Sequence, residues 1–345
     1  MPHRKIIPAI LRKMDVQNSL PVETISLPTP FGVGQVNSFL IVAEPVTLID
    51  AGANTVDGEN ALKLGFAAKG LFLESVERIL ITHGHPDHYG LAPLICNGSQ
   101  TVRAYMGEQE VERIAQAGPV WDGRRRLMEA GFPDELLKDL ARLERRVHRV
   151  HKVAKLQCLP VKDGQVFEFR DFALHAVSLP GHTEGHVGYL EPESRVLFAG
   201  DTLLPHVRPN PLLEPMLEPE GESPSRRRHS LKQYLATLDR LQSLDLTCVY
   251  PGHGPVITNP AEAIDYMRSH HARRLDRVVE SLSAEGSTAY DVSRLLYPKA
   301  EGHARLMAVS EAMAHLDVLV EQRRAKNEIR ENGVEFFSRI SSGIL

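Results

Sequence analysis

The 345-residue sequence predicts an α/β protein with two β-rich halves, a helical segment between them and a mainly helical C-terminal domain. Short β-branched runs bounded by turn residues recur over residues 22–105 and again over residues 155–250, which indicates strands. Residues 107–152 are instead rich in Glu, Arg and Leu. Beyond residue 259, apolar residues recur every three or four positions, the spacing of one face of a helix.

The first β-rich half alternates strands and helices. Residues 38–42 and 46–50 are predicted strands joined by a short turn at Glu44-Pro45. The elements after them are predicted as a helix, a strand, a helix and a strand, at residues 57–69, 76–82, from 92 and 101–105. The strand over residues 76–82 leads directly into the most unusual segment of the chain.

The helical segment over residues 107–152 is predicted to be an insertion between the two halves. Its apolar positions lie three and four residues apart and form one helical face: Leu136, Leu140, Leu143, Val147 and Val150. This face either packs against the rest of the protein or belongs to a lid over a site, and both hypotheses stay open. After it we expect strands within 155–190, at 196–199 and at 246–250, and a helix at 230–241.

The C-terminal domain, residues 259–345, is predicted to hold three helices and a hairpin. The helices fall within residues 264–282, 287–297 and 303–323, and residues 326–340 form a hairpin that turns at Asn332-Gly333. We therefore expect a small winged-helix-like domain. From residue 260 onward there are 12 Lys and Arg residues against 13 Asp and Glu residues, so the basic stripe of a DNA-reading domain is missing. Packing or substrate shaping is the favoured role, ahead of nucleic-acid recognition.

Composition narrows the class of protein. Hydrophobic residues make up 42% and charged residues 24% of the chain, and the formal net charge of −4 indicates no general affinity for nucleic acid or anionic membranes. No apolar run approaches the length of a membrane span, and the N-terminus lacks the pattern of a signal peptide. The three cysteines, Cys96, Cys158 and Cys248, are widely spaced and are expected to be reduced thiols. We expect a cytoplasmic protein, and the sequence does not indicate an oligomeric state.

Residues 81–90, Ile-Thr-His-Gly-His-Pro-Asp-His-Tyr-Gly, place three histidines and one aspartate within six residues, directly after an apolar run. Neutral imidazole and carboxylate are ligands that zinc and similar cations prefer. If these groups were buried without a metal, each unsatisfied group would cost about 1–3 kcal/mol. The cluster therefore predicts a metal site, with a solvated histidine-rich loop as the alternative.

Three further candidate ligands each follow a predicted strand. His182 and His253 come directly after Pro-Gly, and Asp201 comes directly after Ala-Gly. Glycine lets the backbone bend sharply where a strand ends. Because loops at one end of a sheet are the usual place for a functional site, we expect these three residues to join the first cluster.

Together these motifs resemble the metallo-β-lactamase superfamily over roughly residues 22–258. The signature His-x-His-x-Asp-His is complete at residues 83–88, and the later His, Asp and His follow in family order. The resemblance implies a four-layer αββα sandwich with two metal ions at its upper edge. It implies a catalytic domain at residues 20–258, followed by a C-terminal domain at residues 259–345.

Carried over by position, the resemblance assigns seven metal ligands. The first metal takes His83, His85 and His182. The second takes Asp87, His88 and His253, and Asp201 bridges both metals together with a hydroxide.

The resemblance also implies the chemistry. Two divalent ions acidify a shared water, and the resulting hydroxide attacks a carbonyl or phosphoryl centre. Asp87 is the implied catalytic residue, because its second oxygen can orient this hydroxide. Asp50 matches an early aspartate of the family that supports the ligand loop. Zinc is the default metal, with iron and manganese as alternatives, because both accept His and Asp ligands.

Single residues and one further motif narrow the expected class of substrate. Asp201 stands where the best-known β-lactamases of this fold have cysteine, so a β-lactam substrate is not expected. Residues 250–257, Tyr-Pro-Gly-His-Gly-Pro-Val-Ile, and the C-terminal domain resemble the lactamase-like protein 2 group and glyoxalase II-like relatives. Against a strict glyoxalase II, Leu91 follows Gly90 where that family usually has a second glycine. A small acyl substrate, a thioester or a lactone, is the leading expectation.

Two other activities stay open. An endoribonuclease of the lactamase-like protein 2 type would need a basic channel, for which the arginine runs at residues 124–126 and 226–228 are candidates. A mononuclear iron persulfide dioxygenase keeps much of the same motif. The candidate substrate-binding residues for a carboxylate or phosphate are His206, Arg208 and Asn210, in a segment that closely follows the bridging aspartate. Plain loop packing is the alternative role for these three residues.

Overall fold

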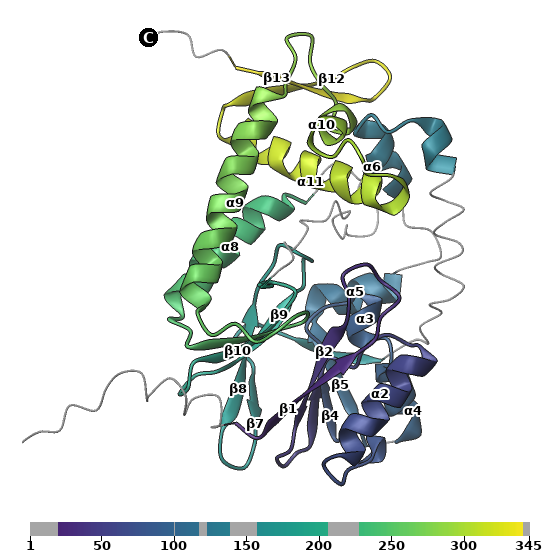
Figure 1. The fold of residues 1–345 in the computed structure, drawn as a ribbon, viewed down its shortest axis with the longest axis vertical. Coiled ribbons are helices and arrows are strands. Elements are labelled where there is room, and N and C mark those ends of the chain that lie inside the picture. Colours follow the sequence, from purple (N-terminus) through teal and green to yellow (C-terminus); the bar gives the residue numbers. More distant parts are fainter. Residues whose placement is uncertain (1–19, 100, 117–122, 139–156, 206–227, 341–345) are drawn as a thin grey trace, which may run out of the picture.

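A computed structural model describes residues 20–99, 101–116, 123–138, 157–205 and 228–340 (Figure 1). Two mixed β-sheets pack face to face, and helices cover their outer faces. A group of helices and a short hairpin lies beyond one end of the sandwich (Figure 1). This arrangement confirms the predicted four-layer sandwich with a small additional C-terminal domain.

The first sheet contains six strands in sequence order: β1 (Val22–Leu27), β2 (Val36–Ile41), β3 (Thr47–Ile49), β4 (Arg78–Leu80), β5 (Arg103–Gly107) and β6 (Cys158–Val161). The first three are antiparallel, and β3 to β6 are parallel. The helices α2 (Val56–Ala67), α4 (Ala92–Gly98) and α5 (Glu108–Gln116) bury apolar residues against its outer face. Thr55 begins α2, because its side chain accepts a hydrogen bond from Gly58 N at 3.0 Å.

The second sheet has the order β11 (Cys248–Pro251), β10 (Val196–Gly200), β9 (Val187–Glu191), β8 (Ala173–Ser178) and β7 (Val166–Glu168). Only the β10–β11 pair is parallel. Aromatic rings fill the space between the sheets; the ring centroid of Phe39 lies 5.3 Å from that of Phe198 and 5.5 Å from that of Tyr250. Such tilted and edge-to-face pairs add to the burial that holds the sheets together.

The outer face of the second sheet is covered by α8 (Ser230–Ser243), which shares one apolar core with the C-terminal helices. These are α9 (Pro260–Glu280), α10 (Ala289–Leu296) and α11 (Gly302–Glu321), followed by the hairpin β12 (Ala325–Ile329) and β13 (Glu335–Arg339). The predicted three helices and hairpin are confirmed. No helix among the described residues is long and apolar enough to cross a bilayer.

The predicted insertion divides between two places: α5 at its start packs on the first sheet, and residues 123–138 pack against the C-terminal helices. After α6 (Gly123–Glu129), the Ala130 carbonyl accepts a hydrogen bond from Tyr290 N at 3.0 Å, and the Phe132 and Tyr290 rings pack edge to face. The predicted apolar face is wrong at Leu136, which is 38% exposed, because Leu137 is the residue buried in this core. The rest of that face lies outside the described residues, so the hypothesis that it belongs to a lid stays a prediction.

The strand directions explain where a site forms. Strands β3 and β4 are parallel, so Asp50 and His83 emerge at the same end of the first sheet. Strands β8, β10 and β11 also share one direction, so the loops after them lie at one edge of the second sheet. The predicted strand over residues 76–82 is shorter than expected, because the chain leaves the β3 pairing after Leu80 and enters the histidine segment.

Candidate metal centre

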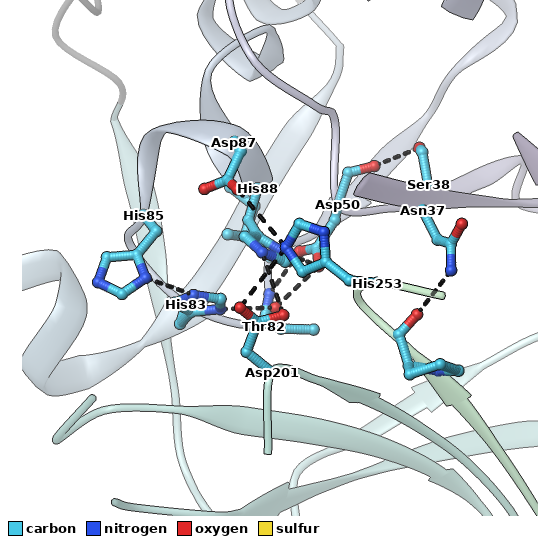
Figure 2. A network of polar contacts seen from close by, with 12 residues as sticks. Asn37, Ser38, Asp50, Thr82, His83, His85, Asp87, His88, Asp201 and His253 are labelled. Carbon is cyan, nitrogen blue, oxygen red and sulfur yellow. Dashed lines mark hydrogen bonds and ion pairs between the residues drawn. The ribbon is translucent and has the colours of Figure 1, made fainter. Parts of the chain in front are cut away.

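All seven predicted ligands meet at this edge of the sandwich. Figure 2 shows six of them, from the loop after β4, the short helix α3 (Pro86–Tyr89) and the ends of β10 and β11. The seventh, His182, follows β8. The ligand atoms form three adjoining groups, each within 4.8 Å: His83, His85 and His182; His83, His88 and Asp201; Asp87, His88 and His253. No other such group is found in the part of the chain that the structure describes.

The first ligand set consists of three imidazoles whose nitrogens point at one another. His85 Nδ1 lies 2.9 Å from His83 Nε2 and 3.0 Å from His182 Nε2. Burial and the neighbouring imidazoles hold the pKa of His83 and His85 well below its ordinary value, so both rings are neutral. Three imidazole nitrogens that point at one another form a donor set that fits a metal ion.

In the second ligand set, each imidazole is held by a hydrogen bond on the side that faces away from the site. His88 Nδ1 lies 2.7 Å from Asp50 Oδ2, and His253 Nδ1 lies 2.7 Å from the Gln35 carbonyl oxygen. These partners place the proton on Nδ1 and turn Nε2 toward the site. Among the described residues, both Nε2 atoms are buried without a hydrogen-bond partner. This is the arrangement by which proteins orient histidines for metal binding.

Asp201 lies between the two sets. Its Oδ1 is 3.4 Å from His88 Nε2, and its Oδ2 is 3.6 Å from both His182 Nε2 and His253 Nε2. Burial opposes ionisation, but His88 and the other imidazoles lower the pKa of Asp201 far below its ordinary value, so the carboxylate is charged. One ionised carboxylate therefore faces ligands of both sets, which is the geometry a bridging residue needs.

Asp50 holds the histidine loop through its carboxylate (Figure 2). Its carboxylate accepts hydrogen bonds from Thr82 N and Thr82 Oγ1, both at 2.8 Å, in addition to its contact with His88. The backbone of Asp50 is left-handed, with φ 55°, a conformation that costs about 1–2 kcal/mol for most residues. The three carboxylate contacts and a hydrogen bond from Ser38 Oγ to its carbonyl keep it there.

The loop that carries His253 is held by Asn37 (Figure 2). Asn37 Nδ2 donates to the carbonyl oxygens of Pro251 and Gly254 at 3.0 and 2.8 Å. Gly252 allows the close approach of this loop to the centre. A Cβ at this position would collide with Asp201 Oδ1 and would lie 2.8 Å from His88 Cε1.

Two residues beside the ligands escaped the sequence prediction. Glu110 on α5 is buried, and its carboxylate accepts hydrogen bonds from Gly84 N and Gly185 N. Burial raises the pKa of Glu110, but Arg113 and the hydrogen bonds lower it to about 2. His186 stacks on His83, and its Nε2 accepts a hydrogen bond from Asp201 N at 3.2 Å. The Gly-His-Thr-Glu-Gly-His spacing could have indicated His186, whereas Glu110 is one of many glutamates in its segment.

The remaining candidates are the three predicted substrate-binding residues and the cysteines. His206, Arg208 and Asn210 lie outside the described residues, so their binding role stays a prediction. The cysteines offer no activated thiolate, because burial raises the pKa of all three, to about 12 for Cys158 and about 11 for Cys248.

Comparison with known proteins relates this centre to one family. Residues 31–253 match the model of the metallo-beta-lactamase superfamily, and residues 275–340 match the model of the metallo-beta-lactamase-like C-terminal domain. The crystal structure of a metallo-beta-lactamase family protein from Thermus thermophilus is 28% identical, with a TM-score of 0.77, and covers 93% of this chain and 99% of its own.

Three relatives of known sequence are also similar. The "Probable metallo-hydrolase YqjP" of Bacillus subtilis is 29% identical over 91% of this chain and 97% of its own. The "Beta-lactamase-like protein 2 homolog" of Caenorhabditis elegans is 25% identical over 88% and 83%. An "Atrochrysone carboxyl ACP thioesterase" of Aspergillus fumigatus is 32% identical over 44% of this chain and 31% of its own. Since the superfamily model matches more than half of the residues and the His/Asp groups are typical of its dinuclear sites, the chain belongs to the metallo-beta-lactamase superfamily.

Proposed function

We propose that the protein is a dinuclear metallohydrolase that cleaves a small acyl substrate, a thioester or a lactone. The observation that carries this proposal is the position of Asp201 between two ligand sets, within 3.6 Å of His182 on one side and His253 on the other. The first ion would be held by His83, His85 and His182, and the second by Asp87, His88 and His253. Zinc is the metal we expect, with iron or manganese as alternatives.

When bound, two such ions supply a water acidified to near-neutral pKa and polarise the substrate carbonyl. The residues of the chain then orient the reactants. Asp87 Oδ2 lies 3.5 Å from His253 Nε2, which leaves Oδ1 to accept a hydrogen bond from the attacking water. Burial raises the pKa of Asp87, but His253 and His88 lower it below its ordinary value, so Asp87 is ionised and suited to this role.

Three observations favour an acyl substrate attacked directly by water. No cysteine has the lowered pKa of a nucleophile, so a covalent thioester intermediate on a cysteine is disfavoured. The relative named as an acyl-carrier thioesterase supports thioester chemistry, although the similarity spans 44% of this chain. Asp201 in the bridging position, where the best-known β-lactamases have cysteine, argues against β-lactams.

The two alternative activities are less well supported. Within the arginine runs, Arg228 is buried and donates to the carbonyls of Gly181 and His182, and Arg126 is buried beside Glu129. These two guanidinium groups therefore support protein structure and do not line a channel for RNA; the other side chains of the runs lie outside the described residues. Two complete ligand sets also argue against a mononuclear dioxygenase. A cytoplasmic location stays a prediction.

The test combines metal analysis with a substrate panel. We expect two divalent ions per chain, hydrolysis of thioesters or lactones, loss of activity with a chelator, and recovery when the metal is restored. One iron per chain with oxygen consumption would replace the proposal with the dioxygenase, and cleavage of RNA alone would replace it with the endoribonuclease. If the metal-loaded protein cleaved none of these substrates, the hydrolase proposal would be wrong.

A further inference from the structure

Glu110 connects the two loops that carry the first ligand set. Its Oε2 accepts a hydrogen bond from Gly84 N at 2.8 Å, and its Oε1 accepts one from Gly185 N at 3.0 Å. Gly84 lies between His83 and His85, and Gly185 is three residues after His182. One buried carboxylate therefore binds one loop from each sheet, and each loop carries ligands of the same set.

The fit around this carboxylate is tight. A Cβ on Gly84 would lie 2.7 Å from Glu110 Oε2, and a Cβ on Gly185 would lie 2.7 Å from Glu110 N. A side chain at Gly185 would meet the backbone of α5 and push the loop away from it, and one at Gly84 would displace the carboxylate itself. Arg113 Nη2, 2.7 Å from Oε2, balances the negative charge that burial would otherwise destabilise.

The second ligand set is held by other residues. His88 is fixed by Asp50, and the His253 loop is fixed by Asn37 and the Gln35 carbonyl. Within the described ranges, the hydrogen bonds of Glu110 do not reach any of these supports. A change at Glu110 should therefore affect one set more than the other.

We propose that Glu110 is a positioning residue that sets the distance between the two loops of the first ligand set and so controls the affinity for one of two ions. The inference rests on the proposed function, in which two ions bind. Residues that orient metal ligands typically contribute tenfold to a hundredfold to metal affinity.

Glu110→Gln tests this with little change in size. A glutamine has one acceptor oxygen in place of two, so one loop amide would face an N–H₂ group and lose its hydrogen bond. In the full chain loaded with Co²⁺, we expect two stepwise dissociation constants, of which one rises about tenfold to a hundredfold and the other changes less than about twofold. With one cobalt ion bound per chain, Glu110→Gln should have the visible spectrum of His182→Ala with one cobalt ion. Its spectrum should differ from that of His253→Ala loaded in the same way.

A matched control is available at Glu191. This buried glutamate also accepts backbone N–H groups, those of Glu193 and Ser194, at the far end of β9 from the centre. Glu191→Gln should lower stability and leave both cobalt dissociation constants and the spectrum unchanged. If Glu110→Gln does not fold, Gly185→Ala serves the same purpose, because its Cβ would displace α5 from the loop while the carboxylate remains.

The outcomes separate the two proposals. If the unaltered protein binds fewer than two ions, the proposed dinuclear function fails. If it binds two ions, and Glu110→Gln or Gly185→Ala binds both with unchanged affinity, only the positioning role of Glu110 is overturned. Equal weakening of both ions would also overturn it, because a general loss of structure would then explain the effect.

Discussion

Two groups of buried histidines occur in the described part of the molecule, and only the group at the sandwich edge has the arrangement of a metal centre. There, His88 and His253 each bond outward through Nδ1, to Asp50 and to a backbone carbonyl. Both Nε2 atoms face inward, toward the carboxylate of Asp201 at 3.4 and 3.6 Å. The two Nε2 atoms converge on one point, and a negative charge lies beside them.

The second group lies in the C-terminal helices. His271 Nδ1 is 3.2 Å from His315 Nε2, and His315 Nδ1 bonds to the Glu311 carbonyl oxygen at 2.7 Å. Here each nitrogen of His315 is used in a chain of hydrogen bonds that joins α9 to α11, and the described residues around it form no metal-ligand group. Burial of histidines is therefore not sufficient for a metal site. His315 also has a carbonyl partner on Nδ1, so the difference lies in Nε2, which faces the Asp201 carboxylate at the sandwich edge but His271 in the C-terminal helices.

The largest effect is expected from removing that carboxylate. Asp201→Ala should abolish activity. The loss of kcat should exceed the hundredfold that removal of a supporting residue can cause, and the metal content should fall from two ions toward one or none. The measurement is metal stoichiometry together with kcat. Two ions per chain in this variant would show that Asp201 does not bridge.

A smaller effect is expected from closing the space beside the centre. The Cβ of Gly252→Ala would collide with Asp201 Oδ1, so the carboxylate or the His253 loop must shift, and we expect about a tenfold to a hundredfold loss of kcat/KM. Gly98→Ala is the control, because a Cβ there meets nothing within 4 Å, and it should have unchanged kinetics. Equal kinetics for both variants would mean that the centre adapts to the added methyl group.

Changing an outward partner tests the comparison directly. Asp50→Asn keeps the size of the side chain but removes one of the acceptor oxygens used by Thr82 and His88, so the second ion should bind about tenfold to a hundredfold more weakly. Asp291→Asn changes a carboxylate that also accepts the amide and hydroxyl of a threonine, Thr288 at the start of α10 in the C-terminal domain, and should leave metal affinity unchanged. Unchanged metal affinity in Asp50→Asn would show that orientation of His88 through Nδ1 is unimportant.

The sequence predicted the ligands better than their supports, for a physical reason. Each ligand lies in a short motif or directly after glycine at a strand end, so local pattern is sufficient to identify it. Glu110 acts on amides that are 26 and 75 positions away, and no local pattern reports such contacts. The same limit appears at Leu136, where helical spacing predicted burial but tertiary packing buried Leu137 instead. The layers of the fold follow from strand and helix patterns, whereas the contacts that tune the centre depend on how distant segments meet.

The smallest effect on the metal centre is expected from the C-terminal pair, which should change stability and leave metal binding unchanged. Burial lowers the pKa of His315 to about 4, below its ordinary value of 6.5, so the unfolded chain binds more protons between these values. The free energy of unfolding should therefore rise from pH 4 to pH 6.5, by up to about 3 kcal/mol from this residue, and level off above. Urea unfolding across this range, in the unaltered protein and in His315→Gln, measures the contribution as a difference in slope.

In His315→Gln the side chain no longer titrates, so the difference in unfolding free energy between the two proteins should shrink as the pH falls from 6.5 to 4. The variant should also be less stable at neutral pH by about 1–3 kcal/mol, because the nitrogen acceptor for His271 is lost. It should keep the metal content of the unaltered protein, since no ligand contacts this pair among the described residues. A change in metal content would mean that the two histidine groups are coupled through the helices. If the unfolding free energies of the two proteins changed with pH in parallel, His315 would have the same pKa in the folded and unfolded chains.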